Sequence, residues 1–82
     1  METTGSPHIS IRLATDADNP TLLRLAALDS APAPHAPVLV ADLDGEIVAA
    51  RSIEQARGSI ADPFRPTADA RELLELRARQ AA

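Results

Sequence analysis

The chain has 82 residues, a net charge of −4, no cysteine and a single aromatic residue, Phe64. This length gives one small domain, whose folding buries only about 60% of the surface of the unfolded chain. The acidic balance argues against a general nucleic-acid binder, because phosphates need a basic surface and single strands need aromatic stacking. A domain of this size with one aromatic residue has a small hydrophobic core, and neither disulfides nor zinc can stabilise it further. We therefore expect a homodimer or a protein partner.

Residues 1–7 are polar, and we expect them to form a flexible N-terminus. They contain no basic stretch followed by an apolar one, and the apolar runs elsewhere in the chain are short. This pattern argues against export and against a membrane anchor. We therefore expect a cytoplasmic protein with one domain over residues 8–82.

Two periodicities describe the first third of the chain. Ile9, Ile11 and Leu13 alternate with polar residues, which predicts a strand over residues 8–14. A helix follows, and the sequence offers two possible starts for it. One is a capping box formed by residues 15 and 18, and the other is a cap at residue 19 followed by proline at residue 20. The helix ends near residue 29 and carries an apolar stripe made of Leu22, Leu25, Ala26 and Leu28.

The middle of the chain predicts a connector and a hairpin. Residues 31–37 read Ala-Pro-Ala-Pro-His-Ala-Pro, which disfavours helix and sheet alike, because each proline removes an N–H donor. An apolar strand over residues 38–43 leads into Asp44 and Gly45, which suit the two positive-φ positions of a tight turn before a strand over 46–53. A second turn at 55–58 precedes a short last strand over 59–62, which should pair with the strand before it.

The last helix begins after Thr67, the expected N-cap. Its helical spacing directs Leu73 and Leu74 toward the sheet. On the outer face, Glu75 has the spacing to pair with Arg79. The order strand, helix, strand, strand, strand, helix predicts the α+β class, with a mainly antiparallel four-stranded sheet packed by two helices.

This order of elements and two sequence segments resemble the GNAT superfamily of N-acetyltransferases. The segments are Ile-Arg-Leu-Ala-Thr at 11–15, followed by Asp18, and Val-Ala-Asp-Leu-Asp-Gly-Glu-Ile-Val-Ala at 40–49. The resemblance runs from about residue 9 to residue 82 and covers only the N-terminal half of the family's fold. It implies a truncated GNAT-like domain without the C-terminal strands.

In that family, the strand before the central helix leads into a glycine-containing loop, Q/R-x-x-G-x-G/A, whose backbone N–H groups bind the pyrophosphate of acetyl-CoA. The corresponding residues 65–71 contain no glycine, while Pro66 removes a donor and Asp69 adds a negative charge. We therefore expect no bound cofactor. Weak candidates for an anion site at this helix start are Arg65, Thr67 and Arg71, although an ordinary cap and solvated arginines explain them more simply.

Other catalytic or metal-binding arrangements have little support. The two histidines, His8 and His35, lie beside the N-terminus and in the proline-rich connector, so a triad or metal cluster would require flexible segments to converge. Asp42, Asp44 and Glu46 cluster at the hairpin, but strand alternation and the turn account for them without a cation. We expect no catalytic residue and no metal ligand.

The resemblance also implies an open sheet edge. A complete acetyltransferase covers its fourth strand with a fifth, whereas here the fourth strand would keep unpaired N–H and C=O groups. We therefore expect association with a second copy, or with a strand of another protein, through Ser59, Ile60, Ala61 and Asp62.

Two functions are consistent with these patterns. The first is a non-catalytic GNAT-like domain that acts as a protein-binding or self-associating module. The alternative is one part of a split acetyltransferase, whose acyl-CoA site is completed by a partner chain. A binding module should ignore acetyl-CoA alone and in complex, whereas a split enzyme should gain CoA affinity once its complementing chain is present.

Overall fold

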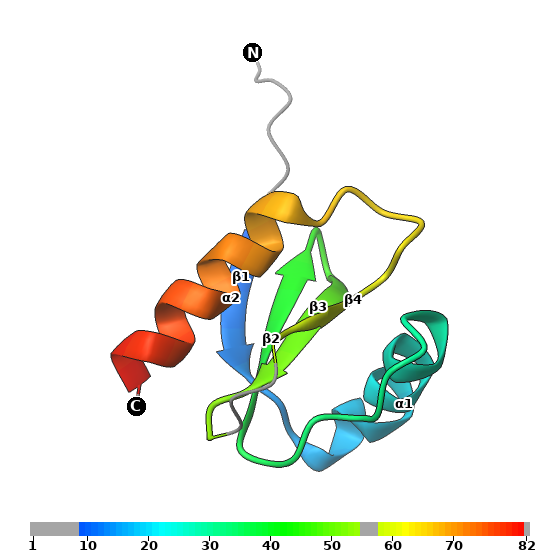
Figure 1. Ribbon diagram of the computed structural model, residues 1–82, viewed down its shortest axis with the longest axis horizontal. Helices are drawn as coiled ribbons and strands as arrows, with labels where there is room; N and C mark the ends of the chain where they lie inside the picture. Colours follow the sequence, from blue (N-terminus) through cyan, green and yellow to red (C-terminus); the bar gives the residue numbers. More distant parts are fainter. Residues whose placement is uncertain (1–8, 55–57, 82) are drawn as a thin grey trace.

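The computed structural model describes residues 9–54 and 58–81 and confirms the α+β class. A four-stranded antiparallel sheet is covered by one helix on each face (Figure 1). The strands are β1 (Ile9–Leu13), β2 (Val38–Leu43), β3 (Glu46–Ser52) and β4 (Ile60–Ala61), and the helices are the 3-10 helix η1 (Asp16–Asp18), α1 (Asn19–Leu28) and α2 (Ala68–Ala81). The strand order is β1-β2-β3-β4, so β1 and β4 form the two edges of the sheet.

The hairpin of β2 and β3 forms the centre of the sheet. Asp44 and Gly45 have φ angles of 51° and 92°, as predicted for a two-residue turn. The Asp42 carboxylate holds this turn, because its Oδ1 accepts the Gly45 N–H at 2.7 Å. The register shifts after Ala41, where Val48 is the extra residue of a bulge. The chain thus builds its two central strands from adjacent segments.

The prediction left two starts open for the first helix, and both are present. Asp18 accepts the Thr15 N–H at 2.8 Å, which forms the capping box of η1. α1 then begins at Asn19, with Pro20 in its first turn. The two signals therefore belong to two consecutive helices.

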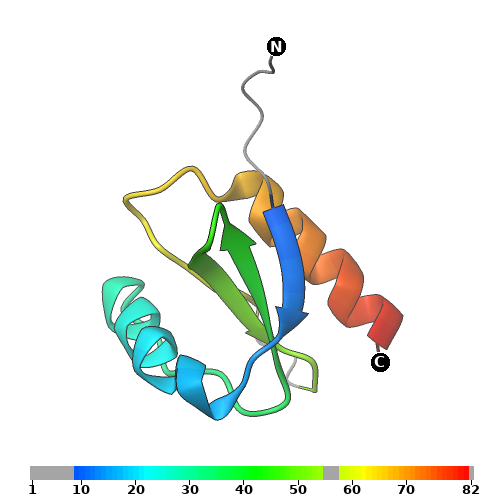
Figure 2. The same cartoon turned by 180° about the vertical axis from the view of Figure 1, so that it is seen from behind.

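α1 covers one face of the sheet, over β3 and β4 (Figure 2). The buried cluster between them consists of Leu22, Leu25, Ala26, Val38, Val40, Ala50 and Ile60. Leu28, which the predicted stripe included, is 38% exposed. The apolar stripe of this helix is therefore shorter than predicted.

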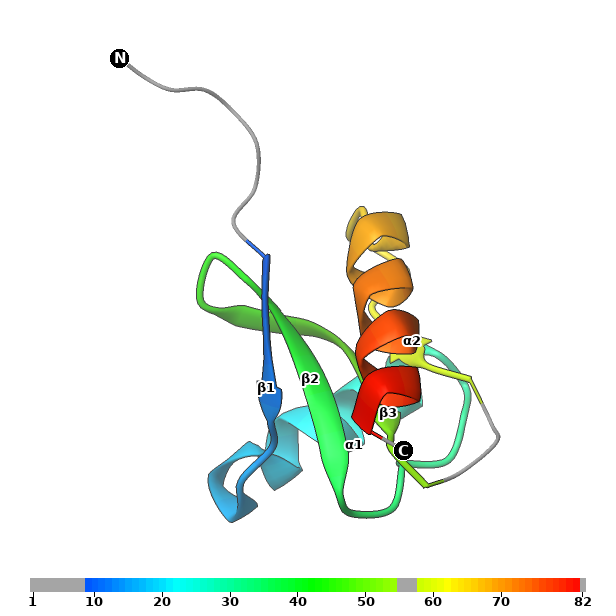
Figure 3. The same cartoon turned by 90° about the vertical axis from the view of Figure 1, so that its left-hand side faces the viewer.

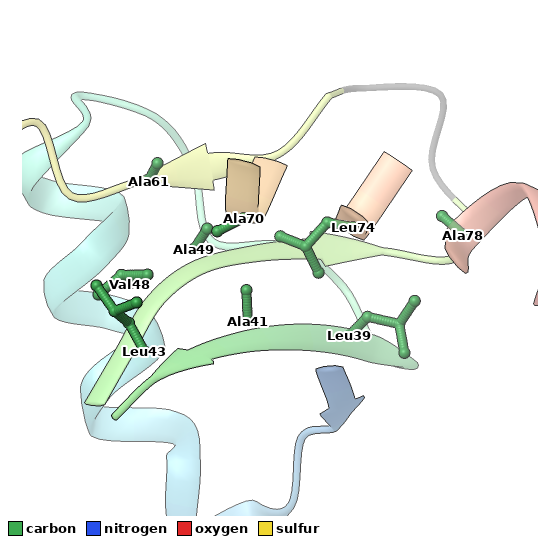
Figure 4. Packing of buried hydrophobic residues seen from close by; sticks show 9 residues of the cluster. All are labelled: Leu39, Ala41, Leu43, Val48, Ala49, Ala61, Ala70, Leu74 and Ala78. Atoms are coloured by element: carbon green, nitrogen blue, oxygen red, sulfur yellow. The ribbon is translucent and has the colours of Figure 1, made fainter. Parts of the chain in front are cut away.

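α2 covers the opposite face, over β1, β2 and β3 (Figure 3). It buries every fourth residue, namely Ala70, Leu74 and Ala78. In Figure 4 these side chains lie against Leu39, Ala41, Leu43, Val48, Ala49 and Ala61 from the sheet. Because many of these residues are alanine, little apolar area is buried for each residue that folding orders.

Two predicted features of α2 are wrong. Leu73 is 37% exposed, whereas Leu74 is fully buried. The buried residues of α2 are spaced four positions apart, so Leu73 lies beside the buried stripe and not within it. Glu75 pairs with Arg51 of β3 instead of lying on the outer face toward Arg79. The helix is therefore rotated relative to the predicted orientation.

The strand boundaries differ slightly from those predicted. β1 is shorter than the predicted strand over 8–14, β3 ends one residue before position 53, and β4 contains two of the four residues predicted over 59–62. The predicted turn at 55–58 lies outside the described residues except for Gly58, and the predicted flexible segment 1–7 also lies outside them. The confirmed elements include the antiparallel pairing of β4 with β3.

Candidate functional site

The first candidate site is the β4 edge, where the sequence predicts unpaired backbone groups. The Asp62 N–H donates to the Val48 carbonyl at 2.9 Å, and Ile60 lies opposite Ala50. Because hydrogen bonding alternates along an antiparallel strand, the backbone groups of Ser59 and Ala61 point away from β3. They are the groups that an added strand would need.

Side chains already occupy three of these outward groups. The Ala61 N–H donates to Asp29 Oδ2 at 3.2 Å, and the Ser59 N–H donates to Glu75 Oε2 at 3.3 Å. The Ser59 carbonyl accepts a hydrogen bond from Arg71 Nη2 at 2.9 Å. The expectation that this edge keeps unpaired groups is therefore wrong at these atoms, because side chains from both helices reach it.

The same side chains contact one another. Arg71 also donates from Nε to Ser59 Oγ at 3.2 Å and lies 3.5 Å from Asp29 Oδ2. Glu75 pairs with Arg51 through its other carboxylate oxygen. A network of alternating charges thus joins the end of α1, the middle of α2 and β3 around the β4 edge.

The three candidates for an anion site have separate roles. Thr67 occupies the N-cap position as predicted, since its carbonyl accepts the Arg71 N–H at 2.9 Å. The Arg71 guanidinium contacts Ser59 and Asp29, whereas that of Arg65 pairs with Glu46, which raises the pKa of Arg65. Both guanidinium groups therefore already contact acidic partners.

An open polar hollow of about 290 Å³ lies beside Arg65. Its lining residues are Arg12, Asp18, Thr21, Arg24, Gly45, Glu46, Ile47, Asp62 and Arg65. Arg12 donates two hydrogen bonds to Asp18, at 2.8 and 3.1 Å. These bonds, with the one from the Thr15 N–H, hold the pKa of Asp18 well below its usual range. Since the lining includes acids beside the arginines, the hollow favours neither anions nor cations.

A second hollow, of about 300 Å³, lies between the end of β1 and the proline-rich connector. It is lined by Leu13, Ala14, Thr15, Asp16, Asn19, Leu22, Pro34, Ala36, Pro37 and Val38. No local sequence pattern indicates either hollow, because each is lined by residues that are far apart in the chain.

The remaining polar candidates form no catalytic or metal centre in the described part of the chain. His8 lies outside the described residues, and His35 is exposed. Residues 9–54 and 58–81 contain no group of three His, Cys, Asp or Glu residues that could hold a metal ion. Among the same residues, no helix is long and apolar enough to cross a membrane.

The opposite edge, β1, was not singled out by the sequence. The Ala14 N–H donates to the Val38 carbonyl at 2.8 Å, and Arg12 lies opposite Val40. By the same alternation, the backbone groups of Ile9, Ile11 and Leu13 point away from β2. Of these outward groups, the Leu13 carbonyl accepts a side-chain hydrogen bond, from Arg12 Nη1 at 3.3 Å.

β1 is therefore the more accessible edge in the described part of the chain. It has five residues, whereas β4 has two. The signal for it was present in the alternation of residues 9 to 13, but the sequence alone does not show that this strand is an edge.

Comparison of the chain with protein-family models, with curated proteins and with solved structures found no match.

Proposed function

We propose that this chain is a non-catalytic, GNAT-like α+β domain that acts by binding a second copy of itself or another protein through a sheet edge. The observation that carries the proposal is β1, a five-residue edge strand whose outward backbone groups at Ile11 have no partner in the described residues. Edge strands of this kind readily accept a further strand.

The composition of the core supports association. Seven of the sixteen buried apolar residues in the described ranges are alanines, which contribute little apolar area. Several larger apolar side chains remain exposed: Leu13, Leu23, Leu28, Phe64, Leu73 and Leu76. A small domain with few large buried side chains commonly gains stability from a second chain.

The helix start after β4 supports a non-catalytic role. Residues 65–71 contain no glycine that would let backbone N–H groups approach a pyrophosphate. Arg65 and Arg71 are paired with Glu46 and Asp29, so binding a phosphate there would require these pairs to separate. Both features disfavour an acetyl-CoA site in the isolated chain.

The alternative is a split acyl-CoA site that a partner chain completes. One observation favours it: α2 is the next element after the edge strand β4 and carries Arg71 in its first turn, a place where helix N–H groups attract anions. This alternative requires a partner that displaces Asp29 from Arg71.

The two functions are separated by titrating acetyl-CoA in a calorimeter into the chain alone and into its complex with a partner chain that copurifies with it, while measuring the mass in solution across a concentration series. The proposal expects no heat of binding. Saturable micromolar binding that Arg71→Ala abolishes and Arg24→Ala preserves would establish the acyl-CoA site instead. A monomer whose amides at both edges are protected from hydrogen exchange would also contradict the proposal, because both edges would then be closed.

A further inference from the structure

We propose that β1 pairs in antiparallel fashion with β1 of a second copy, about a two-fold axis at Ile11, to form one continuous eight-stranded sheet. This inference rests on the proposed function and specifies its edge, its partner and its register.

The backbone of β1 suits a two-fold axis at Ile11. The groups of Ile9, Ile11 and Leu13 point away from β2. With the axis at Ile11, this residue exchanges both hydrogen bonds with its own copy, while Ile9 exchanges them with Leu13 of the second copy. Every outward group in the strand thereby gains a backbone partner.

The side chains match in the same register. Ile9 and Ile11 pack against the cluster beneath α2, and alternation directs Leu13 to the same face. Directly opposed residues on antiparallel strands share a face, so Ile11 meets Ile11 and Ile9 meets Leu13, which are favourable apolar pairs. On the other face, Ser10 lies opposite Arg12, so no like charges are opposed.

Neighbouring registers are less favourable. An axis at Arg12 would place two guanidinium groups opposite each other. It would also rely on backbone groups that already pair with β2 across from Val40. An axis at Leu13 would leave Ile9 without a partner in β1. The pattern of the strand therefore selects Ile11.

There is room for the second copy beside β1. α2 packs mainly on β2 and β3, and in the view of Figure 3 β2 lies between β1 and α2. With strands about 4.8 Å apart, two α2 helices, each centred between β2 and β3 of its own copy, would be roughly 19 Å apart. Packed helices need only about 10 Å, so they would not collide.

Leu73 adds apolar surface next to this edge. Arg71 and Glu75 lie on the side of α2 toward β4, because they contact Ser59. Leu73 lies on the other side of the buried stripe, toward β1, and is 37% exposed. Leu13 is 56% exposed on the same face. A continuous sheet would thus bring two exposed leucines of each copy beside the shared strands.

The β4 edge is a weaker competitor. A strand added there would have to displace Asp29 from Ala61 and both Arg71 and Glu75 from Ser59. It would also gain a partner strand of only two residues. β1 offers a longer strand at which only the contact of Arg12 with the Leu13 carbonyl must be shared or released.

Single cysteines test the register, since the chain has none of its own. In the proposed dimer the two Ile11 Cα atoms lie about 5.5 Å apart, within the range of about 4.4–6.8 Å that disulfides need. Ile11→Cys should therefore form a disulfide-linked dimer under mild oxidation. Ser10→Cys is the matched control on the same strand. In the proposed register Ser10 lies opposite Arg12 of the second copy, so the two Ser10 Cα atoms are diagonal to each other and roughly 8 Å apart.

Charge substitutions test the pairing without oxidation. Leu13→Lys should weaken the dimer by about tenfold, because two symmetry-related apolar pairs are lost. Leu23→Lys is the control, since Leu23 is 64% exposed on α1, remote from β1. The double variant Ile9→Glu/Leu13→Lys should recover dimerisation, because each new acid faces a new base across the axis. Sedimentation over a concentration series gives the dissociation constants.

Failure of this inference differs from failure of the proposed function. A monomer at high micromolar concentration with a rapidly exchanging Ile11 amide would overturn the dimer but leave an open edge for another protein. A dimer in which Ile11→Cys links no better than Ser10→Cys, or in which Leu13→Lys behaves like Leu23→Lys, would also overturn it. Saturable binding of acetyl-CoA would contradict the proposed function itself.

Discussion

Arg51 of β3 and Glu75 of α2 form an ion pair across one face of the sheet, with side chains that are 15% and 34% exposed, respectively. The second oxygen of Glu75 accepts the Ser59 N–H at 3.3 Å. One carboxylate therefore positions α2 against β3 and also covers the backbone just before β4. Helix docking and closure of the β4 edge depend on the same residue.

Glu75→Ala should lower the free energy of unfolding by about 1–3 kcal/mol, because it removes hydrogen bonds between a charged group and both Arg51 and Ser59. Glu72→Ala is the matched control, since Glu72 is exposed on the same helix and should change stability by less than about 0.5 kcal/mol. Urea unfolding followed by circular dichroism measures both. Equal effects would show that the Arg51 pair contributes nothing to docking.

Asp29→Ala should expose the β4 edge. Its carboxylate accepts the Ala61 N–H, so hydrogen exchange at this amide should accelerate by about tenfold, as expected for losing a bond to a charged group. Global stability should change less. Asp29 lies at the C-terminal end of α1, where a negative charge is unfavourable for the helix dipole, so its removal offsets part of the lost hydrogen bond. Exchange measured by NMR, with Asp16→Ala as control, tests this. An unchanged Ala61 rate would contradict the assigned contact.

Leu74→Ala should destabilise the domain by about 2–5 kcal/mol, because Leu74 is fully buried between α2 and the sheet. Leu73→Ala should cost less than half as much, since Leu73 is 37% exposed. Chemical unfolding of the two variants under the same conditions compares them directly. A larger loss for Leu73 would restore the orientation of α2 that the sequence predicted.

Ser30→Gly should stabilise the domain by about 0.5–1 kcal/mol. Ser30 has a φ of 51° at the end of α1, where the Ala31 N–H closes the helix onto the Ala26 carbonyl at 2.9 Å. A side chain is strained in this left-handed conformation, and glycine is not. Ala27→Gly, inside the same helix, should destabilise by about 1 kcal/mol. The two thermal midpoints should therefore move in opposite directions.

Asp18→Asn should reduce stability at neutral pH but not in acid. Arg12 and the Thr15 N–H hold the pKa of Asp18 below its usual range in the folded protein. A lowered carboxylate pKa stabilises the fold above about pH 4, the value for the unfolded chain, and this contribution is lost as the pH falls further. The difference from the native chain should therefore shrink below pH 4. A constant difference would exclude the Arg12 pair as its source.

Local patterns in the sequence determined much of the fold. Asp44 and Gly45 specify a tight turn through their own backbone preferences, and the alternation at Ile9, Ile11 and Leu13 specifies a strand. The sequence also indicates a helix start at Thr67. Such features depend on dihedral preferences and on the spacing of neighbouring residues, so they can be read without knowing which segments meet.

Only the tertiary structure decided which sheet edge is open. The residues that cover β4 lie far along the chain, since Asp29 precedes Ala61 by 32 positions. Arg71 and Glu75 reach Ser59 from a helix whose rotation the sequence predicted incorrectly. Periodicity identifies the buried face of an element, but it does not show where a long polar side chain ends across a sheet. For that reason the sequence directed attention to β4, whereas packing closes β4 and leaves β1 accessible.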